Sequence, residues 1–308
     1  MEISILIPEY LRQLHALGRS PCTIRTTKYG LRDFTRFLKT EDLHQAEDLT
    51  ADVLSEYRQD LSFRITAKGG LLSIRSQVRH LCVVKGFTRF LRDRDYLVHD
   101  PAASLKLPKE PKRLPSVILS RSEIKILMQT PDMRTNQGFR NRIALEILYD
   151  TAIRRAELAN VRISDPDLKS GYLRITGKGD KERVVPLSPG VCDLVNAYIL
   201  SVRPSYIKGD DPGWLILNRN GQKMNVAGIW AIVKRCAALS GLKKNITVHT
   251  FRHTCATHML KNGAPIRHIQ EMLGRILRIH PDLHQGHHQR PQKNPRTVPS
   301  GGTPESFH

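Results

Sequence analysis

Four short motifs in the second half of the chain carry side chains that suit chemistry at a phosphate group. They are TAIRRAEL (151–158) with Arg154 and Arg155, GKGDKERVVPL (177–187) with Lys178, HTFRHT (249–254) with His249, Arg252 and His253, and LG (273–274). Arginine binds two non-bridging phosphate oxygens at once, where charge builds up during phosphoryl transfer. Lysine or histidine can protonate a leaving 5′ oxygen, and another histidine can take a proton from a nucleophile. The motifs lack the paired carboxylates that would hold a metal, so together they predict metal-independent chemistry at a phosphodiester.

Each motif taken alone also has a purely structural interpretation. An arginine in a buried helix more often forms an ion pair than a catalytic contact. A lysine in a Gly-x-Gly turn is usually solvated, and HxxRH can combine a helix start with surface charge. The combination of all four motifs in one domain is what favours the catalytic interpretation.

The composition favours a polyanionic partner. The 308 residues carry a formal net charge of +20, and most of the excess lies after residue 107. Binding to DNA phosphates releases condensed counterions, so this charge predicts a nucleic-acid partner, with a solubilising surface as the alternative. No apolar run approaches the roughly 20 residues of a membrane span, and the N-terminus lacks the pattern of a signal peptide. Five scattered cysteines form no CxxC pair, so we expect a cytoplasmic protein without disulfides or zinc.

The first domain, residues 1–107, is predicted to be a small helical bundle. Ser20 followed by Pro21 is a typical helix start, and Thr50 is a plausible cap for a second helix. A third helix is expected from about Leu71 to Leu91, with basic side chains spread along it. Such a bundle could lie on a nucleic acid.

The proline-rich run KLPKEPKRLP (106–115) predicts a linker at 108–116, followed by a second domain at 117–274. SRSE (120–123) is a capping box, and Arg142 to Tyr149 is predicted to be a buried helix that ends in DTAIRRAEL. YLRIT (172–176) and RVVPL (183–187) predict a β-hairpin. Helices are also expected around 190–203, 224–240 and 251–273. The predicted fold is therefore mainly α with a small antiparallel sheet.

The order, spacing and flanks of the four motifs resemble the tyrosine recombinase (phage integrase) family, in particular its Xer-type bacterial branch. The resemblance covers residues 5–274 and implies a helical, SAM-like core-binding domain that clamps DNA and an α+β catalytic domain. It implies site-specific recombination through a 3′-phosphotyrosine, without a cofactor or metal, on duplex DNA in a tetrameric synapse of related protomers at the nucleoid. The family's catalytic residues fall on Arg154, Lys178 (the general acid), His249 and Arg252, and its supporting residues on Glu157 and His253. Ala152 stands where the family usually has glycine.

Two parts of the family pattern are missing after Gly274. Arg275 occupies the position of a histidine or tryptophan, and all eight tyrosines lie at or before Tyr206, so the nucleophile is absent. A one-base shift allows the codons from Arg275 onward to encode ASSASTQIYTRVTI, with tyrosine at the expected ninth place. We interpret residues 275–308 as an out-of-frame, disordered tail. Its histidines could suggest a metal site, but Pro281 and Gly286 argue against the helix that would pair them.

The sequence is compatible with three functions. The first is a site-specific recombinase that lacks its nucleophile, and the second is a sequence-specific DNA-binding protein without catalysis. The third is a type IB-like topoisomerase, which shares the chemistry but works without a paired protomer.

Overall fold

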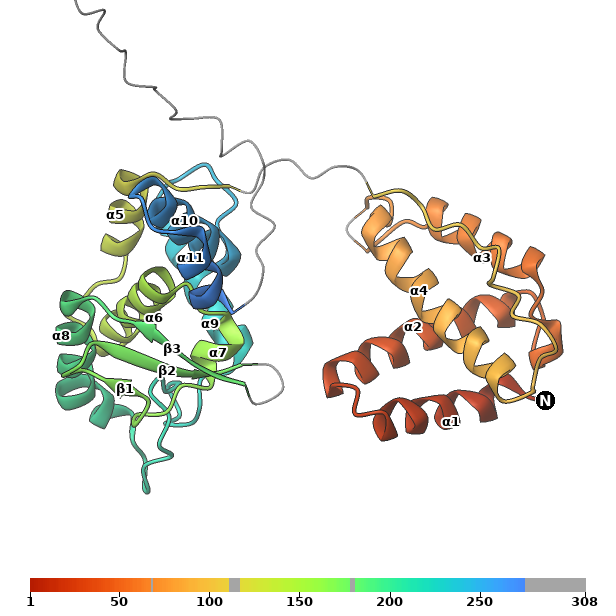
Figure 1. Ribbon diagram of the computed structural model, residues 1–308, viewed down its shortest axis with the longest axis horizontal. Helices are drawn as coiled ribbons and strands as arrows, with labels where there is room; N and C mark the ends of the chain where they lie inside the picture. The colour runs from red at the N-terminus through yellow and green to blue at the C-terminus, as the bar shows by residue number, and fades with distance from the viewer. Residues whose placement is uncertain (68, 111–116, 178–180, 275–308) are drawn as a thin grey trace, which may run out of the picture. The chain divides into compact units, whose positions relative to one another are not determined.

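The chain divides into two compact units, residues 1–114 and 115–308, and the division falls within the proline-rich run (Figure 1). The structure, a computed structural model, describes residues 1–67, 69–110, 117–177 and 181–274. Lys178 and the tail from Arg275 onward lie outside these residues. Each unit has a hydrophobic core of its own.

The N-terminal unit is a helical bundle. Its α-helices are α1 (Ile3–Ala16), α2 (Pro21–Thr40), α3 (Ala51–Phe63) and α4 (Ile74–Asp93), with a short 3-10 helix at Ala46–Asp48. The predicted caps at Ser20 and Thr50 are confirmed, because each hydroxyl accepts a hydrogen bond from the backbone N–H three residues on. The third predicted helix begins later than expected, at Ile74, where Ser73 provides the cap.

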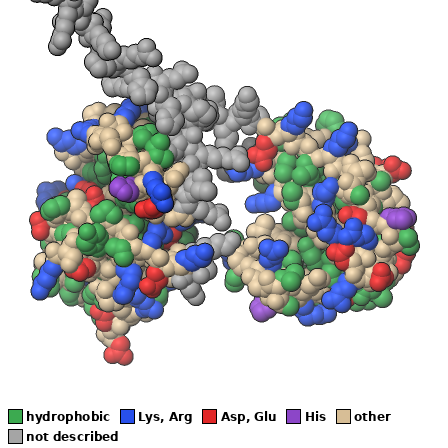
Figure 2. Space-filling model, viewed as in Figure 1, with side chains coloured by type: hydrophobic (Ala, Val, Ile, Leu, Met, Phe, Trp, Pro, Cys, Tyr) green, Lys and Arg blue, Asp and Glu red, His purple; other side chains and the backbone are tan. Residues whose placement is uncertain are grey.

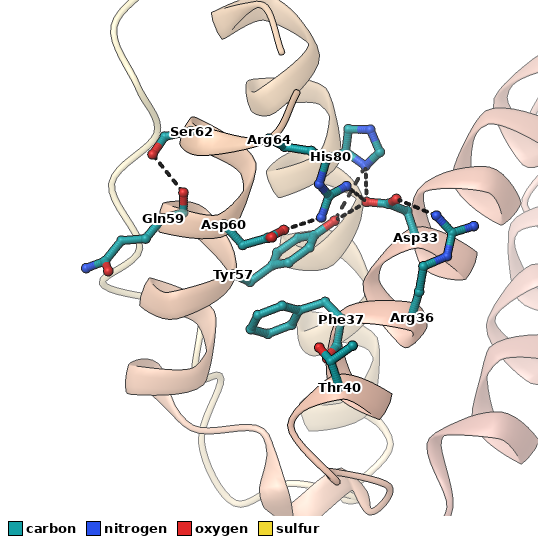
Figure 3. Close-up of polar contacts among 10 residues, drawn as sticks. All are labelled: Asp33, Arg36, Phe37, Thr40, Tyr57, Gln59, Asp60, Ser62, Arg64 and His80. Carbon is teal, nitrogen blue, oxygen red and sulfur yellow. Dashed lines mark hydrogen bonds and ion pairs between the residues drawn. The ribbon is translucent and has the colours of Figure 1, made fainter. Parts of the chain in front are cut away.

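A polar cluster links three helices of this bundle beside an aromatic core (Figure 3). The Asp33 carboxylate on α2 accepts hydrogen bonds from the Tyr57 hydroxyl at 3.0 Å and from Arg64 at 2.5 Å. His80 on α4 lies 3.4 Å from the same carboxylate, and Arg64 also pairs with Asp60. Burial opposes ionisation of Asp33, but the hydrogen bonds from Arg64 and Tyr57 outweigh it, so the pKa of Asp33 is lowered.

The second unit combines helices with one small sheet, as predicted. Its helices are α5 (Arg121–Gln129), α6 (Asn136–Thr151), α7 (Arg155–Ala159), α8 (Pro189–Ala197), α9 (Val226–Leu239), α10 (Val248–Lys261) and α11 (Ile266–Leu273). The capping box at the start of α5 is confirmed. Ser120 accepts a hydrogen bond from the Glu123 amide at 3.2 Å, and the Glu123 side chain accepts one from the Ser120 amide at 2.7 Å.

The sheet has three antiparallel strands in the order β1-β2-β3: β1 (Pro166–Asp167), β2 (Tyr172–Thr176) and β3 (Glu182–Pro186). The predicted hairpin is confirmed in β2 and β3, where Leu173 pairs with Val185. Leu173, Ile175 and Val185 are buried, so one face of the hairpin packs on the core of the unit. β1 was not predicted, because two residues are too few to show an alternating pattern.

Two predicted helices differ from the structure. The segment expected as one helix at 251–273 contains two, because Gly263 adopts a φ of 84° and Pro265 cannot donate a backbone hydrogen bond. The helix expected at 190–203 stops being α-helical after Ala197. It continues as a π-helical turn (Tyr198–Val202) and a 3-10 turn (Arg203–Tyr206).

Candidate active site

Arg154, which was predicted at the end of the buried helix, lies just beyond that helix, at a sharp turn between α6 and α7. α6 ends at Thr151, and Ala152 then takes the left-handed conformation with φ 51° and ψ 26°. Glycine adopts this conformation without a Cβ penalty, whereas alanine pays roughly 1–2 kcal/mol. The turn makes Arg154 the N-cap residue of α7 and explains why glycine suits position 152.

Glu157 lies directly against Arg154. Its carboxylate is buried and accepts hydrogen bonds from the Arg154 backbone amide at 2.8 Å and from Arg154 Nη1 at 2.7 Å. Burial alone would raise the pKa of Glu157, but the hydrogen bonds from Arg183 and Arg154 lower it below its ordinary value. Glu157 is therefore ionised at neutral pH and fixes both ends of Arg154.

Arg183 completes this arrangement, although its role was not predicted from the sequence. Arg183 donates to both carboxylate oxygens of Glu157, at 3.1 and 2.8 Å, and to the backbone carbonyl of Met272 at 3.1 Å. Strand alternation places Arg183 on the same face of β3 as the buried Val185. An arginine at an inward-facing strand position was the signal that could have identified it.

His249 and Arg252 lie in the first two turns of α10, which Thr247 caps. Arg252 donates to the Ala152 carbonyl at 2.8 Å and to the Leu273 carbonyl, so it ties the α6–α7 turn to the end of α11. Burial first, and then the charge of Arg154, lower the pKa of Arg252 to about 10. Among the described residues, no carboxylate lies within 4.0 Å of its guanidinium. Arg252 is thus a partly buried positive charge without a carboxylate partner among the described residues.

The two histidines of HTFRHT are both partly buried. Burial lowers the pKa of His249, and the charges of Arg155, Arg252 and Arg154 lower it further. The pKa of His253 is also lowered, by burial and then by His249 and Arg252. Both imidazoles are therefore mainly neutral at pH 7, the state in which histidine accepts a proton.

A cavity of about 740 Å³ lies beside Arg154, and His249, Arg252 and His253 are not among its lining residues. Its lining includes Arg154, Glu157, Gly177, Lys181, Arg183 and Gly274. The hairpin that carries Lys178 borders this cavity. Residues 178–180 are not described, but the two residues that flank them are hydrogen-bonded, with the Gly177 amide donating to the Lys181 carbonyl at 2.8 Å. Within the described ranges, no group of three His, Cys, Asp or Glu side chains could hold a metal ion. The cavity thus offers Arg154, Lys181 and Arg183 to an anion, while Arg252 and the two histidines lie outside its lining.

A model of the phage integrase family matches residues 118–275, which include this whole site. The chain belongs to the phage integrase family. The tyrosine recombinase XerD of Staphylococcus epidermidis is 33% identical over 277 residues, covering 88% of this chain and 90% of the relative. The tyrosine recombinase XerD of Staphylococcus aureus strain N315 is 33% identical over 270 residues, with 87% and 89% covered.

Two solved structures of DNA-bound proteins have the same fold. The XerH site-specific recombinase bound to palindromic difH substrate is 20% identical with a TM-score of 0.67, over 84% of this chain and 75% of that one. A lambda integrase tetramer bound to a Holliday junction is 16% identical with a TM-score of 0.67, over 91% and 79%. The predicted family and fold class are confirmed. In the part of the chain that the structure describes, no helix is long and apolar enough to cross a membrane.

Proposed function

We propose that this chain binds duplex DNA and holds one backbone phosphate between Arg154 and Arg252. The observation that carries the proposal is that Arg252 donates to the Ala152 carbonyl, two residues before Arg154. Arg154 pairs with Glu157, whereas among the described residues no carboxylate lies within 4.0 Å of Arg252. Positive groups held this close repel one another, and a phosphate would relieve that repulsion. Lys and Arg side chains spread over the visible face of the N-terminal unit favour DNA as the source of this phosphate (Figure 2).

In this proposal each residue has a defined role. Arg154 and Arg252 bind the non-bridging oxygens, and Glu157 keeps Arg154 in place. Lys178 is the general acid for the leaving 5′ oxygen, and neutral His249 accepts a proton from the nucleophile, with His253 in support. The reaction is strand cleavage and rejoining by a site-specific recombinase, and the partners are duplex DNA and further recombinase protomers.

We further propose that the present chain binds DNA but does not cleave it. No tyrosine follows Tyr206, and the ninth place beyond Arg275 is occupied by His284. The match to the family model also ends at residue 275, where the shifted reading would begin, which supports a frameshift. This polypeptide then acts as a DNA-binding protein without catalytic activity. Without a nucleophile, Arg154 and Arg252 can bind the phosphate but cannot cleave the strand. A type IB-like topoisomerase would need the same missing tyrosine.

The test compares this chain with a repaired chain that has two bases added at codon 275. Both proteins are mixed with labelled duplex DNA for gel shifts and with nicked suicide duplexes for covalent capture. We expect both to shift duplex DNA, with affinity falling steeply as salt rises. Only the repaired chain should give an SDS-stable adduct. An adduct from the present chain would show that the nucleophile lies elsewhere, and failure of both chains to bind at low salt would overturn the proposal.

A further inference from the structure

Arg140 on α6 is a buried arginine whose charge is not balanced by a carboxylate. It is 6% exposed, and its Nε and Nη2 donate to the Asn141 side-chain oxygen at 3.3 and 3.0 Å. Its Nη1 donates to the Leu217 carbonyl at 3.2 Å, and the guanidinium lies 5.3 Å from the centre of the Tyr206 ring. In the described part of the chain, no carboxylate comes within 4.0 Å of it. Burying a charge without an opposite charge is costly, so this arrangement is unusual for a purely structural arginine.

Arg203, close by in the same unit, shows how the fold treats a structural arginine. Arg203 is 1% exposed and donates to the Trp214 carbonyl at 2.9 Å and to Asp211 at 2.7 Å. The hydrogen bond from Arg203 is the main reason why the pKa of Asp211 falls to about 2. The fold therefore supplies a counter-charge to Arg203 and leaves Arg140 without one.

Arg140 lines a cavity of about 400 Å³, which we call the Arg140 pocket. Its polar lining consists of Gln137, Arg140, Asn141, Tyr206, Arg219 and Arg235, and no Asp or Glu contributes to it. Arg140 is the buried member of this set, whereas Arg219 and Arg235 are exposed. Met224 and Ile232 add apolar surface. The volume falls within the roughly 300–1,000 Å³ of small-ligand sites.

The hydrogen bonds of Arg140 leave donors for a ligand. A guanidinium has five N–H donors, and the three hydrogen bonds named above use three of them. Guanidinium groups bind phosphate bidentately, and three of them around one pocket match an anion with several acceptor oxygens. The Arg140 pocket shares no lining residue with the cavity beside Arg154, so it is a second site.

We propose that the Arg140 pocket binds a phosphate group that is not the one held by Arg154 and Arg252. The phosphate group can belong to either of two ligands. One is a second backbone phosphate of the DNA, an assignment that rests on the proposed function, and the other is a free phosphorylated small molecule. Arg140 meets the phosphate at the base of the pocket, and Arg219 and Arg235 hold it from the rim.

The test uses the full chain and a double variant of the exposed rim, Arg219→Gln/Arg235→Gln. The matched control is Arg134→Gln/Arg267→Gln, which removes the same charge from two arginines that are 90% and 89% exposed. One arm measures duplex DNA affinity against salt concentration. The other measures the melting temperature in pyrophosphate against chloride at equal ionic strength.

Each outcome decides the proposal. If the rim variant lowers the log–log salt slope by about 0.9 per lost contact and the control does not, the phosphate belongs to DNA. If the slope is unchanged but the rise in melting temperature with pyrophosphate is lost only in the rim variant, the ligand is a free phosphorylated molecule. If the rim variant equals the control in both arms, the proposal is wrong. Should the unaltered chain fail to bind DNA, the proposed function fails while the pyrophosphate arm still tests the pocket.

Discussion

Replacing Arg183 by methionine should destabilise the second unit and loosen the candidate active site. Arg183 makes two hydrogen bonds to the Glu157 carboxylate and one to the Met272 carbonyl. Methionine fills similar space but leaves the buried Glu157 with Arg154 as its remaining cation. Removing one partner of a buried ion pair costs roughly 3–5 kcal/mol, and Arg154 offsets part of this loss. We therefore expect Arg183→Met to lower the free energy of unfolding by about 3 kcal/mol at pH 7.

The assay is denaturant unfolding followed by tryptophan fluorescence. Both tryptophans of the chain, Trp214 and Trp230, lie in the second unit, so the signal reports that unit alone. The matched control is Arg174→Met on β2, whose ion pair with Asp165 at 3.4 Å involves a 53% exposed arginine. Such exposed pairs contribute about 0–1 kcal/mol.

The pH dependence makes the test sharper. The pKa of Glu157 is lowered in the folded state, so its stabilisation is complete above the unfolded value of about 4.3 and is lost as pH falls through the folded pKa. The difference between the unaltered chain and Arg183→Met should therefore shrink as pH falls below about 4.3. Glu157→Gln combined with Arg183→Met should cost much less than the sum of the two single changes. A cost no larger than that of Arg174→Met at pH 7 would show that Arg183 does not stabilise the buried Glu157 carboxylate.

Three further predictions concern single positions. Arg252→Ala in the repaired chain should abolish the covalent adduct while gel shifts still show DNA binding; adduct formation at the unaltered rate would remove Arg252 from the phosphate site. Ala152→Gly should raise the free energy of unfolding of the second unit by about 1 kcal/mol, because glycine relieves the left-handed strain, and a loss of stability would contradict this. Asp33→Asn should speed hydrogen exchange across α2, α3 and α4 at pH 7, measured by mass spectrometry. Because the pKa of Asp33 is lowered, its contribution to stability disappears as pH falls below about 3.9, and hydrogen exchange in the two proteins should become equal in acid. Equal exchange already at pH 7 would argue that the Asp33 cluster does not stabilise the bundle.

The sequence predicted those parts of the fold that depend on local signals. Helix starts could be predicted at Ser20, Thr50 and Ser120, because a side-chain hydroxyl there accepts a hydrogen bond from a free backbone amide of the first turn in any tertiary context. The break between α10 and α11 also had local signals in Gly263 and Pro265, but the hydrophobic spacing on both sides concealed them. The family motifs indicated Arg154 and Arg252, although not the turn that separates Arg154 from α6.

Contacts between distant segments could not be predicted from one sequence. Arg183 meets Glu157 and Met272 because β3, α7 and α11 converge, and nothing in GKGDKERVVPL states which residues lie opposite the strand. The pocket around Arg140 depends likewise on α6, the 3-10 turn at Arg203–Tyr206 and α9 coming together. In both cases the contacts that set the arginine apart, with a carboxylate for Arg183 and without one for Arg140, come from segments distant in the sequence.

The end of α11 is fixed by two arginines that also hold the candidate active site. Arg252 binds the Leu273 carbonyl and the Ala152 turn, while Arg183 binds the Met272 carbonyl and Glu157. Gly274 follows with φ 61°, and a side chain there would meet the Arg183 guanidinium at 3.3 Å. Any segment that continues from Gly274 therefore starts from a point set by Arg252 and Arg183. Nine residues extend at most about 30 Å, so in the proposed repaired chain this anchor would limit how far the tyrosine can lie from Arg154. A change that displaces the end of α11 would then move the tyrosine of the repaired chain out of line with the phosphate and slow its attack. DNA binding would not weaken, because in-line placement is most of what a protein contributes to phosphoryl transfer.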